Sequence, residues 1–176
     1  MTGSVVAVLG RGVVDPGLPV VLADDLGLSR GDGCFETCRV VTDPSGTSHV
    51  DNLDAHLARL ARSVRMLRIV IDIDSCRALL EVAVAAWTEP GEAAVKLMVT
   101  RGVEGTGVPT VIATVHSISE AALRQRSTGI RVITLPRGTT AATYTDADWL
   151  LGGVKLLSYA VNMAALREAA GRGVTT

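Results

Sequence analysis

A single apolar stripe defines the strongest element of this chain, a helix over residues 53–67. The stripe consists of Leu53, Leu57, Leu60, Val64 and Leu67, which step along the chain by four and three residues. That spacing places all of them on one face of a helix. Asp51 or Asn52 is well placed to cap its first turn. The chain therefore contains a helix whose apolar side must be buried in a folded domain.

Strand patterns flank this helix on both sides. Before it, residues 5–9 and 13–14 indicate a hairpin around a glycine turn, and residues 34–41 alternate and turn back into residues 49–50. After it, we expect a second helix over residues 75–87, ended by a Glu-Pro-Gly turn. The remaining expected elements are strands over residues 94–100, 110–116 and 130–135, with a short helix over residues 120–125.

The order of these elements predicts an α+β fold in two unequal parts. Residues 1–135 form an N-terminal α+β domain, and residues 136–148, which are small and polar, form an interdomain linker. Residues 149–176 begin a C-terminal domain with one helix. Because a lone apolar helix is an odd end for a domain, either it packs back on the first domain or the sequence belongs to a longer chain.

Composition narrows the classes of partner. The chain has 176 residues, of which 48% are hydrophobic, and a formal net charge of −1. No block of lysine and arginine supplies the electrostatic footprint of a nucleic-acid-binding protein. No apolar stretch approaches the length of a membrane span. The 3 cysteines and 3 scattered histidines argue against a disulfide framework and a metal site, and they fit a reducing cytoplasm.

Lys155 is the first candidate for chemistry, because it is one of only two lysines and lies in an otherwise apolar run. Poor hydration there favours the neutral amine, the form that attacks aldehydes and makes Schiff bases. On the helix expected after Gly153, Lys155 shares one face with Ser158, Tyr159 and Asn162. A lysine that snorkels from a helix start would give the same pattern, so spacing alone leaves both interpretations open.

A second group of candidates lies on the first helix and on the strand before it. His56, Arg59 and Ser63 share a side rotated away from the leucine stripe, where Arg59 could donate two hydrogen bonds to a phosphate or carboxylate. A solvated face is the alternative, and spacing alone favours it. Glu36 faces the same side of its strand as two cysteines, and a half-buried carboxylate needs a partner.

Lys96 is the other lysine and the obvious competitor for the Schiff-base role. It lies in the alternating strand over residues 94–100, where an edge or solvent-facing position would explain it. The following loop, residues 102–107, is rich in glycine. That loop is therefore either a gate over the substrate or a long turn.

Four motifs, taken in order, resemble one known family. They are residues 30–37 (RGDGCFET), residues 56–60 (HLARL), Thr100-Arg101-Gly102, and Lys155 at the opening of a helix. This set resembles the class IV aminotransferases, or fold type IV pyridoxal-phosphate enzymes, which include branched-chain and D-amino-acid aminotransferases and aminodeoxychorismate lyases. The resemblance implies the small domain of that fold, a β-sheet with two helices, followed by a linker and the first helix of the large domain.

The resemblance also implies roles for particular residues. Lys155 matches the lysine that forms the internal aldimine with pyridoxal 5′-phosphate and moves the substrate's proton, and Arg59 matches the arginine that holds the cofactor phosphate. Tyr159 is a candidate cofactor contact through its helical spacing from Lys155 and has no assigned role in the family pattern, and Phe35 and Arg101 are candidate substrate contacts. The assembly implied is a homodimer that acts on a small amino-acid-like molecule.

Among the family's activities the motifs favour aminodeoxychorismate lyase, which releases pyruvate and leaves 4-aminobenzoate for folate synthesis. D-amino-acid enzymes tend to have tyrosine where Phe35 stands, and residues 103–109 lack their Arg-x-His substrate trap. Lyases often carry an arginine where this loop has Thr106, so an amino-acid aminotransferase is the alternative. A non-catalytic binding or assembly domain is the second alternative. The family's acidic partner of the pyridine nitrogen would lie beyond Thr176, so we expect a longer chain.

Overall fold

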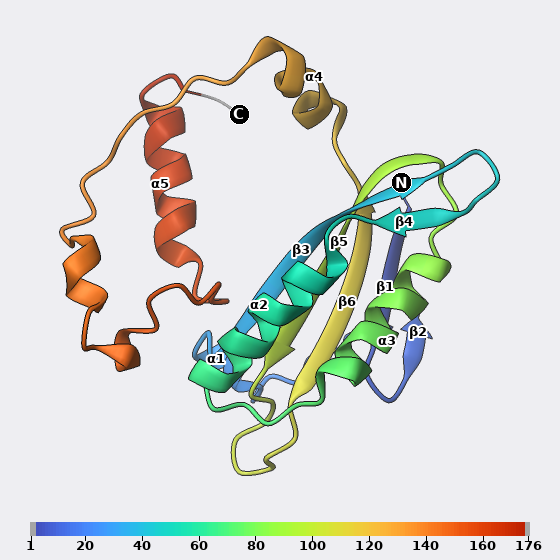
Figure 1. Ribbon diagram of the computed structural model, residues 1–176, viewed down its shortest axis with the longest axis horizontal. Helices are drawn as coiled ribbons and strands as arrows, with labels where there is room; N and C mark the ends of the chain where they lie inside the picture. Colours follow the sequence, from blue (N-terminus) through green and yellow to red (C-terminus); the bar gives the residue numbers. More distant parts are fainter. Residues whose placement is uncertain (1–2, 175–176) are drawn as a thin grey trace.

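Six antiparallel strands form one sheet in the computed structural model, which describes residues 3–174 (Figure 1). Their order across the sheet is β2-β1-β6-β5-β3-β4. The strands are β1 (Ser4–Val8), β2 (Gly12–Val14), β3 (Gly33–Thr42), β4 (Ser48–Val50), β5 (Gly91–Thr100) and β6 (Thr110–Ser117). The helices are α1 (Leu26–Ser29), α2 (Leu53–Met66), α3 (Ile73–Ala85), α4 (Glu120–Thr128) and α5 (Ala160–Gly171), with short 3-10 turns η1 (Ala141–Tyr144) and η2 (Asp148–Leu150).

Helices α2 and α3 cover one face of the sheet and bury the main core there (Figure 1). The predicted stripe supplies Leu57, Leu60 and Val64 of α2 to this core. Every second residue of β5 faces the helices and is buried, namely Ala93, Val95, Leu97 and Val99. Burying apolar area of this kind stabilises a fold by about 25 cal/mol per Å². The α+β expectation is confirmed.

The opposite face of the sheet carries both lysines, and we call it the lysine face. Because side chains alternate along a strand, Phe35, Thr37 and Arg39 of β3 point to this face while their neighbours Glu36 and Cys38 point to the helices. The register between β3 and β5 sets Thr37 opposite Lys96 and Phe35 opposite Met98. The lysine face is therefore defined by Phe35, Thr37, Arg39, Lys96, Met98 and Thr114.

The start of α2 differs from the predicted cap. Asn52 is the N-cap residue, but its backbone is left-handed (φ 52°) and its side chain makes no capping hydrogen bond. The carboxylate of Asp51 instead pairs with Arg39 at 2.8 Å. The hairpin between β3 and β4 sets the geometry here, so a long-range ion pair takes the place of a local cap.

Lys155 does not lie on a helix, and the predicted stripe of Lys155, Ser158, Tyr159 and Asn162 is wrong. Helix α5 begins only at Ala160, with Tyr159 as its N-cap residue. The chain over residues 155–157 is extended and hydrogen-bonded to β3, through a bridge between Cys34 and Leu156. An open sheet edge therefore outcompetes the local helix propensity, which is weak beside two glycines.

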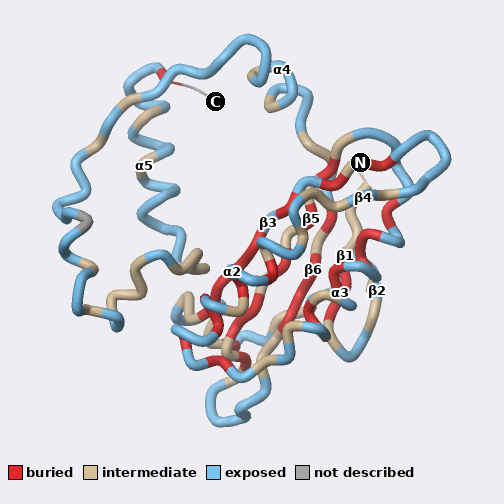
Figure 2. The backbone as a smooth tube through the Cα atoms, viewed as in Figure 1, coloured by how far each residue is buried: buried red, intermediate tan, exposed pale blue. Residues whose placement is uncertain are grey.

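The predicted strand over residues 130–135 is also absent. This stretch has no ladder partner among the described residues, and the side chains of Ile130 and Val132 are 60% and 76% exposed. A strand needs a neighbour for its backbone groups, which the six-stranded sheet does not offer here. Figure 2 shows that the chain from α4 onward is mostly exposed, in contrast to the sheet. The predicted division at residues 135 and 148 stays a prediction.

No helix within residues 3–174 is both long and apolar enough to cross a membrane. No group of three or more histidine, cysteine, aspartate or glutamate residues in the same range could hold a metal ion.

Candidate active site

The segment that carries Lys155 docks on the free edge of β3. The backbone N–H of Phe35 donates to the Lys155 carbonyl at 3.0 Å, and the N–H of Leu157 donates to the Gly33 carbonyl at 2.9 Å. These two bonds form an isolated antiparallel bridge to β3 at a stretch that β4 does not reach. Lys155 is thus placed by backbone pairing, which fixes its position more tightly than a loop would.

The Lys155 side chain lies against two aromatic rings. Its Nζ lies 4.2 Å from the centroid of the Phe35 ring and 5.4 Å from that of Tyr159. The two rings meet edge to face, with centroids 5.5 Å apart. Every ion pair among the described residues uses arginine or histidine as its cation, so Lys155 has no carboxylate partner there. The amine is held on an aromatic surface and left free to react.

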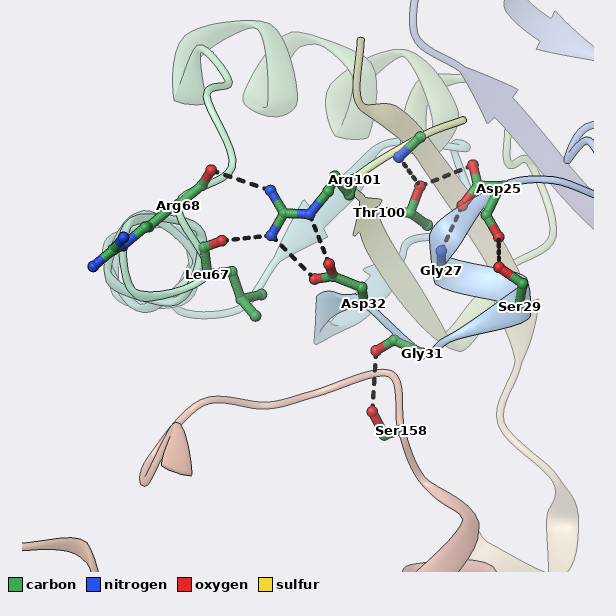
Figure 3. A network of polar contacts seen from close by, with 11 residues as sticks. Asp25, Gly27, Ser29, Gly31, Asp32, Leu67, Arg68, Thr100, Arg101 and Ser158 are labelled. Carbon is green, nitrogen blue, oxygen red and sulfur yellow. Dashed lines mark hydrogen bonds and ion pairs between the residues drawn. The ribbon is translucent and has the colours of Figure 1, made fainter. Parts of the chain in front are cut away.

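Glycines in the loop before β3 make this docking possible (Figure 3). Gly31 has a φ of +69°, and its carbonyl accepts a hydrogen bond from the Ser158 hydroxyl at 3.0 Å. A Cβ at Gly33 would collide with the Val99 carbonyl and with Leu157. The two glycines of the RGDG motif therefore let the lysine segment approach the sheet closely.

Arg101 fastens the same loop to the end of α2 (Figure 3). Its Nε donates to Asp32 at 2.6 Å, and its guanidinium also donates to the carbonyls of Leu67 at 2.7 Å and Arg68 at 3.3 Å. It lines a cavity of about 630 Å³ that also includes Trp149. Most of its donors are already used, so these contacts indicate that Arg101 positions the loop. Its predicted substrate contact stays a prediction.

Asp25 is a structural carboxylate that the sequence analysis missed. It is only 1% exposed, and it accepts a hydrogen bond from the hydroxyl of Thr100 at 2.9 Å (Figure 3). It accepts another from the hydroxyl of Thr110 at 2.7 Å. It also caps α1 through the Gly27 N–H at 2.7 Å. The signal was present as an aspartate directly before a short apolar turn, the usual pattern of an N-cap.

Glu36, which needs a partner as a carboxylate on a half-buried strand, pairs with Arg59 and His56. Although only 2% exposed, it accepts two hydrogen bonds from Arg59, at 2.6 and 2.5 Å, and its Oε2 lies 2.9 Å from Nδ1 of His56. Burial alone would raise the pKa of Glu36, but hydrogen bonds from Arg59 and His56 lower it below its ordinary value. The Arg59 side chain is 44% exposed, so it keeps N–H groups free for an anion.

Lys96 lies on β5, between β3 and β6, so it is not at an edge, but its side chain is half-exposed on the face opposite the helices, as the solvent-facing alternative expects. Its Nζ lies 4.5 Å from the centroid of Phe35, the ring that Lys155 also contacts. Burial lowers the pKa of Lys96, and the charge of Lys155 lowers it further. The two lysines of the chain therefore converge on one side chain, a juxtaposition that no local sequence pattern encodes.

The comparison with known proteins decides the family. The family model for class IV amino-transferases matches residues 33–176. The chain belongs to the class IV aminotransferases. A bifunctional aminodeoxychorismate lyase / D-amino acid transaminase from Mycobacterium tuberculosis is 38% identical over 171 residues, which are 96% of this chain and 57% of that protein.

Solved structures agree with this assignment. A hypothetical aminotransferase from M. tuberculosis, in its form bound to pyridoxal phosphate, superimposes with a TM-score of 0.89 at 38% identity, over 98% of this chain and 60% of that one. The fold IV transaminase CpuTA1 from Curtobacterium pusillum gives 0.88 at 37% identity, over 98% and 62%. The chain thus spans less than two thirds of these relatives, and the resemblance to fold type IV is confirmed.

The donors of the site fit the family's cofactor, pyridoxal phosphate. Its aldehyde needs an unprotonated amine without a competing partner, and Lys155 has no carboxylate partner among the described residues. Its phosphate needs a planar, always charged donor with N–H groups to spare, and the half-exposed Arg59 is one. The predicted roles of Lys155, Arg59, Tyr159 and Phe35 remain predictions about this chain.

Proposed function

We propose that the chain is the N-terminal part of a pyridoxal-phosphate-dependent enzyme acting on an amino-acid-like substrate, with aminodeoxychorismate lyase as its reaction. The substrate would be 4-amino-4-deoxychorismate and the products 4-aminobenzoate and pyruvate. One observation carries the proposal: a lysine that has no carboxylate partner among residues 3–174 and is fixed by backbone pairing against Phe35 and Tyr159. The family assignment and the bifunctional relative, whose name includes this lyase, support it.

Each residue has a defined task in this proposal. Lys155 would hold the cofactor through Nζ, and its amine would take the proton from the carbon that bears the substrate's amino group. Pyridoxal phosphate, when bound, supplies an electron sink for the pair that this proton leaves behind. Arg59 holds the phosphate, and Glu36 and His56 orient Arg59. Phe35 shields the amine from water on one side.

Amino-acid transamination is the second candidate. The M. tuberculosis relative is named for both activities, and a structure similar to this chain holds α-ketoglutarate and the amine form of the cofactor. Both reactions begin with the same proton transfer, so Lys155 serves either. The loop over residues 102–107, which follows the network of Arg101, is where the two substrates would be distinguished.

The test is a visible absorption spectrum of the full-length protein with added pyridoxal phosphate, before and after borohydride. We expect a yellow band that borohydride removes, with the cofactor then found on the Lys155 peptide by mass spectrometry. Pyruvate release from aminodeoxychorismate is compared with amino transfer to a keto acid in the same preparation. A folded protein that forms no band under these conditions would support the non-catalytic alternative.

We also propose that the protein is a cytoplasmic homodimer, as in the assembly implied by the family resemblance. Light scattering of the full-length protein measures its mass in solution. A monomer that still binds the cofactor and turns over substrate would contradict the dimer.

A further inference from the structure

Lys96 is a cation without a counter-ion in the middle of a sheet. Across the described residues every ion pair uses arginine or histidine, so the Lys96 ammonium has no carboxylate partner. It is half-buried, and its Nζ lies 4.5 Å from the centroid of the Phe35 ring. The Phe35 ring and solvent offset part of the cost of holding a charged amine here, and the ammonium keeps N–H donors free for an anion or another acceptor. Such an acceptor is not supplied by residues 3–174.

The neighbours of Lys96 add two hydroxyl groups to the same spot. The ladder sets Thr37 of β3 on one side of Lys96 and Thr114 of β6 on the other. Neither hydroxyl takes part in a hydrogen bond among the described residues. An ammonium between two free hydroxyls presents several donors to one point on the lysine face, which is a suitable arrangement for a carboxylate.

Arg39 is a second cation on the lysine face, and its ion pairs are within the protein. It lies two residues beyond Thr37 on β3, and its guanidinium pairs with Asp51 at 2.8 Å and with Glu92 at 2.7 Å. Its positive charge is therefore satisfied within the protein. Lys96, by contrast, lies near the charge of Lys155 and has no such pair among the described residues.

We propose that Lys96, flanked by the hydroxyls of Thr37 and Thr114, binds a carboxylate of the amino substrate. The inference rests on the proposed function, because it takes the reacting carbon to lie at Lys155. The Nζ atoms of both lysines lie over the Phe35 ring, at 4.5 Å for Lys96 and 4.2 Å for Lys155. One small molecule can therefore span from the reacting amine to the carboxylate contact.

An apolar cavity beside this contact gives room for the rest of such a molecule. It measures about 340 Å³ and is lined by Met98 and Thr114 of the lysine face and by Leu157, two residues after Lys155. Its walls thus connect the lysine segment with the strand next to Lys96. A carboxylate on an apolar skeleton matches both parts: the skeleton contacts the cavity and the anion contacts Lys96.

The test measures binding of glutarate, a dicarboxylate that has no amino or keto group and cannot react. Calorimetric titration is carried out on the full-length protein loaded with pyridoxal phosphate. We expect Lys96→Met to weaken glutarate binding by about tenfold or more, as for a lost hydrogen bond to a charged group. Lys96→Arg, which keeps the charge, should stay within about threefold of the wild type. Arg39→Met is the matched control and should leave the dissociation constant unchanged.

Cofactor absorption and circular dichroism are recorded for each variant, and Lys96→Gln replaces Lys96→Met if the latter does not fold. Two results would overturn the inference: a neutral Lys96 variant that binds glutarate as well as the wild type, or a cofactor-loaded wild type that does not bind glutarate at all. Failure of the proposed function looks different, because the wild type would then show no cofactor band. The two failures are therefore separated by the spectrum alone.

Discussion

The two faces of β3 differ in whether their charged side chains have a partner within the protein. On the helix-covered face, the buried carboxylate of Glu36 has two partners, Arg59 and His56, within 3 Å. On the lysine face, Lys96 and Lys155 share one aromatic ring, and neither pairs with a carboxylate among the described residues. A charge satisfied inside the protein contributes to the fold, whereas a charge left free is available to a ligand. The same strand thus has an internally paired carboxylate on one side and two amines without a carboxylate partner among residues 3–174 on the other.

The largest effect should come from removing the reacting amine on the lysine face. We expect Lys155→Ala to abolish covalent cofactor attachment and to lower turnover by roughly a thousandfold or more, as for loss of a covalent catalyst. The fold should persist, because the segment is held by backbone bonds that alanine keeps. Absorption spectra and thermal melts measure the two properties. A parallel loss of folding would show that the side chain also serves the structure.

On the helix-covered face the expected loss is in stability. Glu36→Ala should lower the free energy of unfolding by about 2 kcal/mol, because it removes a buried carboxylate that is paired with Arg59. The loss is limited because Arg59 is half-exposed, so water solvates its guanidinium when Glu36 is absent. Denaturant titration measures the change. Glu92→Ala is the control, since Glu92 carries two ion pairs at the more accessible end of β5, with Arg39 and Arg126. It should cost clearly less, and an equal cost would contradict the contrast between the two faces.

The pH dependence of stability sharpens the comparison. The folded-state pKa of Glu36 lies below the ordinary value of 4.5, so the folded protein releases this proton more readily than the unfolded chain. The stabilisation is then fully present above pH 4.5 and is lost as the pH falls through the folded-state pKa. In Glu36→Gln this part of the acid dependence should disappear from unfolding titrations between neutral and acidic pH. If the acid dependence of stability is unchanged in Glu36→Gln, that dependence comes from other carboxylates.

The smallest effect concerns the thiols. Burial raises the pKa of Cys34 to about 12 and those of Cys38 and Cys76 to about 11. All three are buried, so a thiol reagent at pH 8 should label none in the native protein and all three in denaturant. Labelling of one cysteine without denaturant would reveal local opening of the helix-covered face.

Local patterns predicted the elements that depend on local physics. The stripe of α2 and the alternation of β3 follow from residues a few positions apart, and the need of Glu36 for a partner follows from its place on a half-buried strand. The family resemblance singled out Lys155 and Arg59 in the same way, from short motifs. These parts of the fold and of the candidate site could be predicted from the sequence alone.

The rest depends on contacts between distant parts of the chain. The sheet order sets β6 between β1 and β5, which makes β5 a central strand and places Lys96 inside the sheet. Residues 155–157 favour a helix locally, but β3 offers them backbone partners more than a hundred positions away. Asp25 likewise meets its threonine partners only in the folded sheet. No periodicity within one segment encodes such pairings.

The docking of residues 155–157 on β3 also has a consequence for synthesis of the chain. The sheet is complete in sequence once β6 ends at Ser117, but the edge of β3 between Gly33 and Phe35 stays uncovered until Lys155 leaves the ribosome. At a rate of about 5–20 residues per second this interval lasts a few seconds. During that time, we expect the bare edge to accept any extended strand that reaches it, including one from another nascent chain. The lysine segment thus also protects this stretch of the β3 edge from wrong partners.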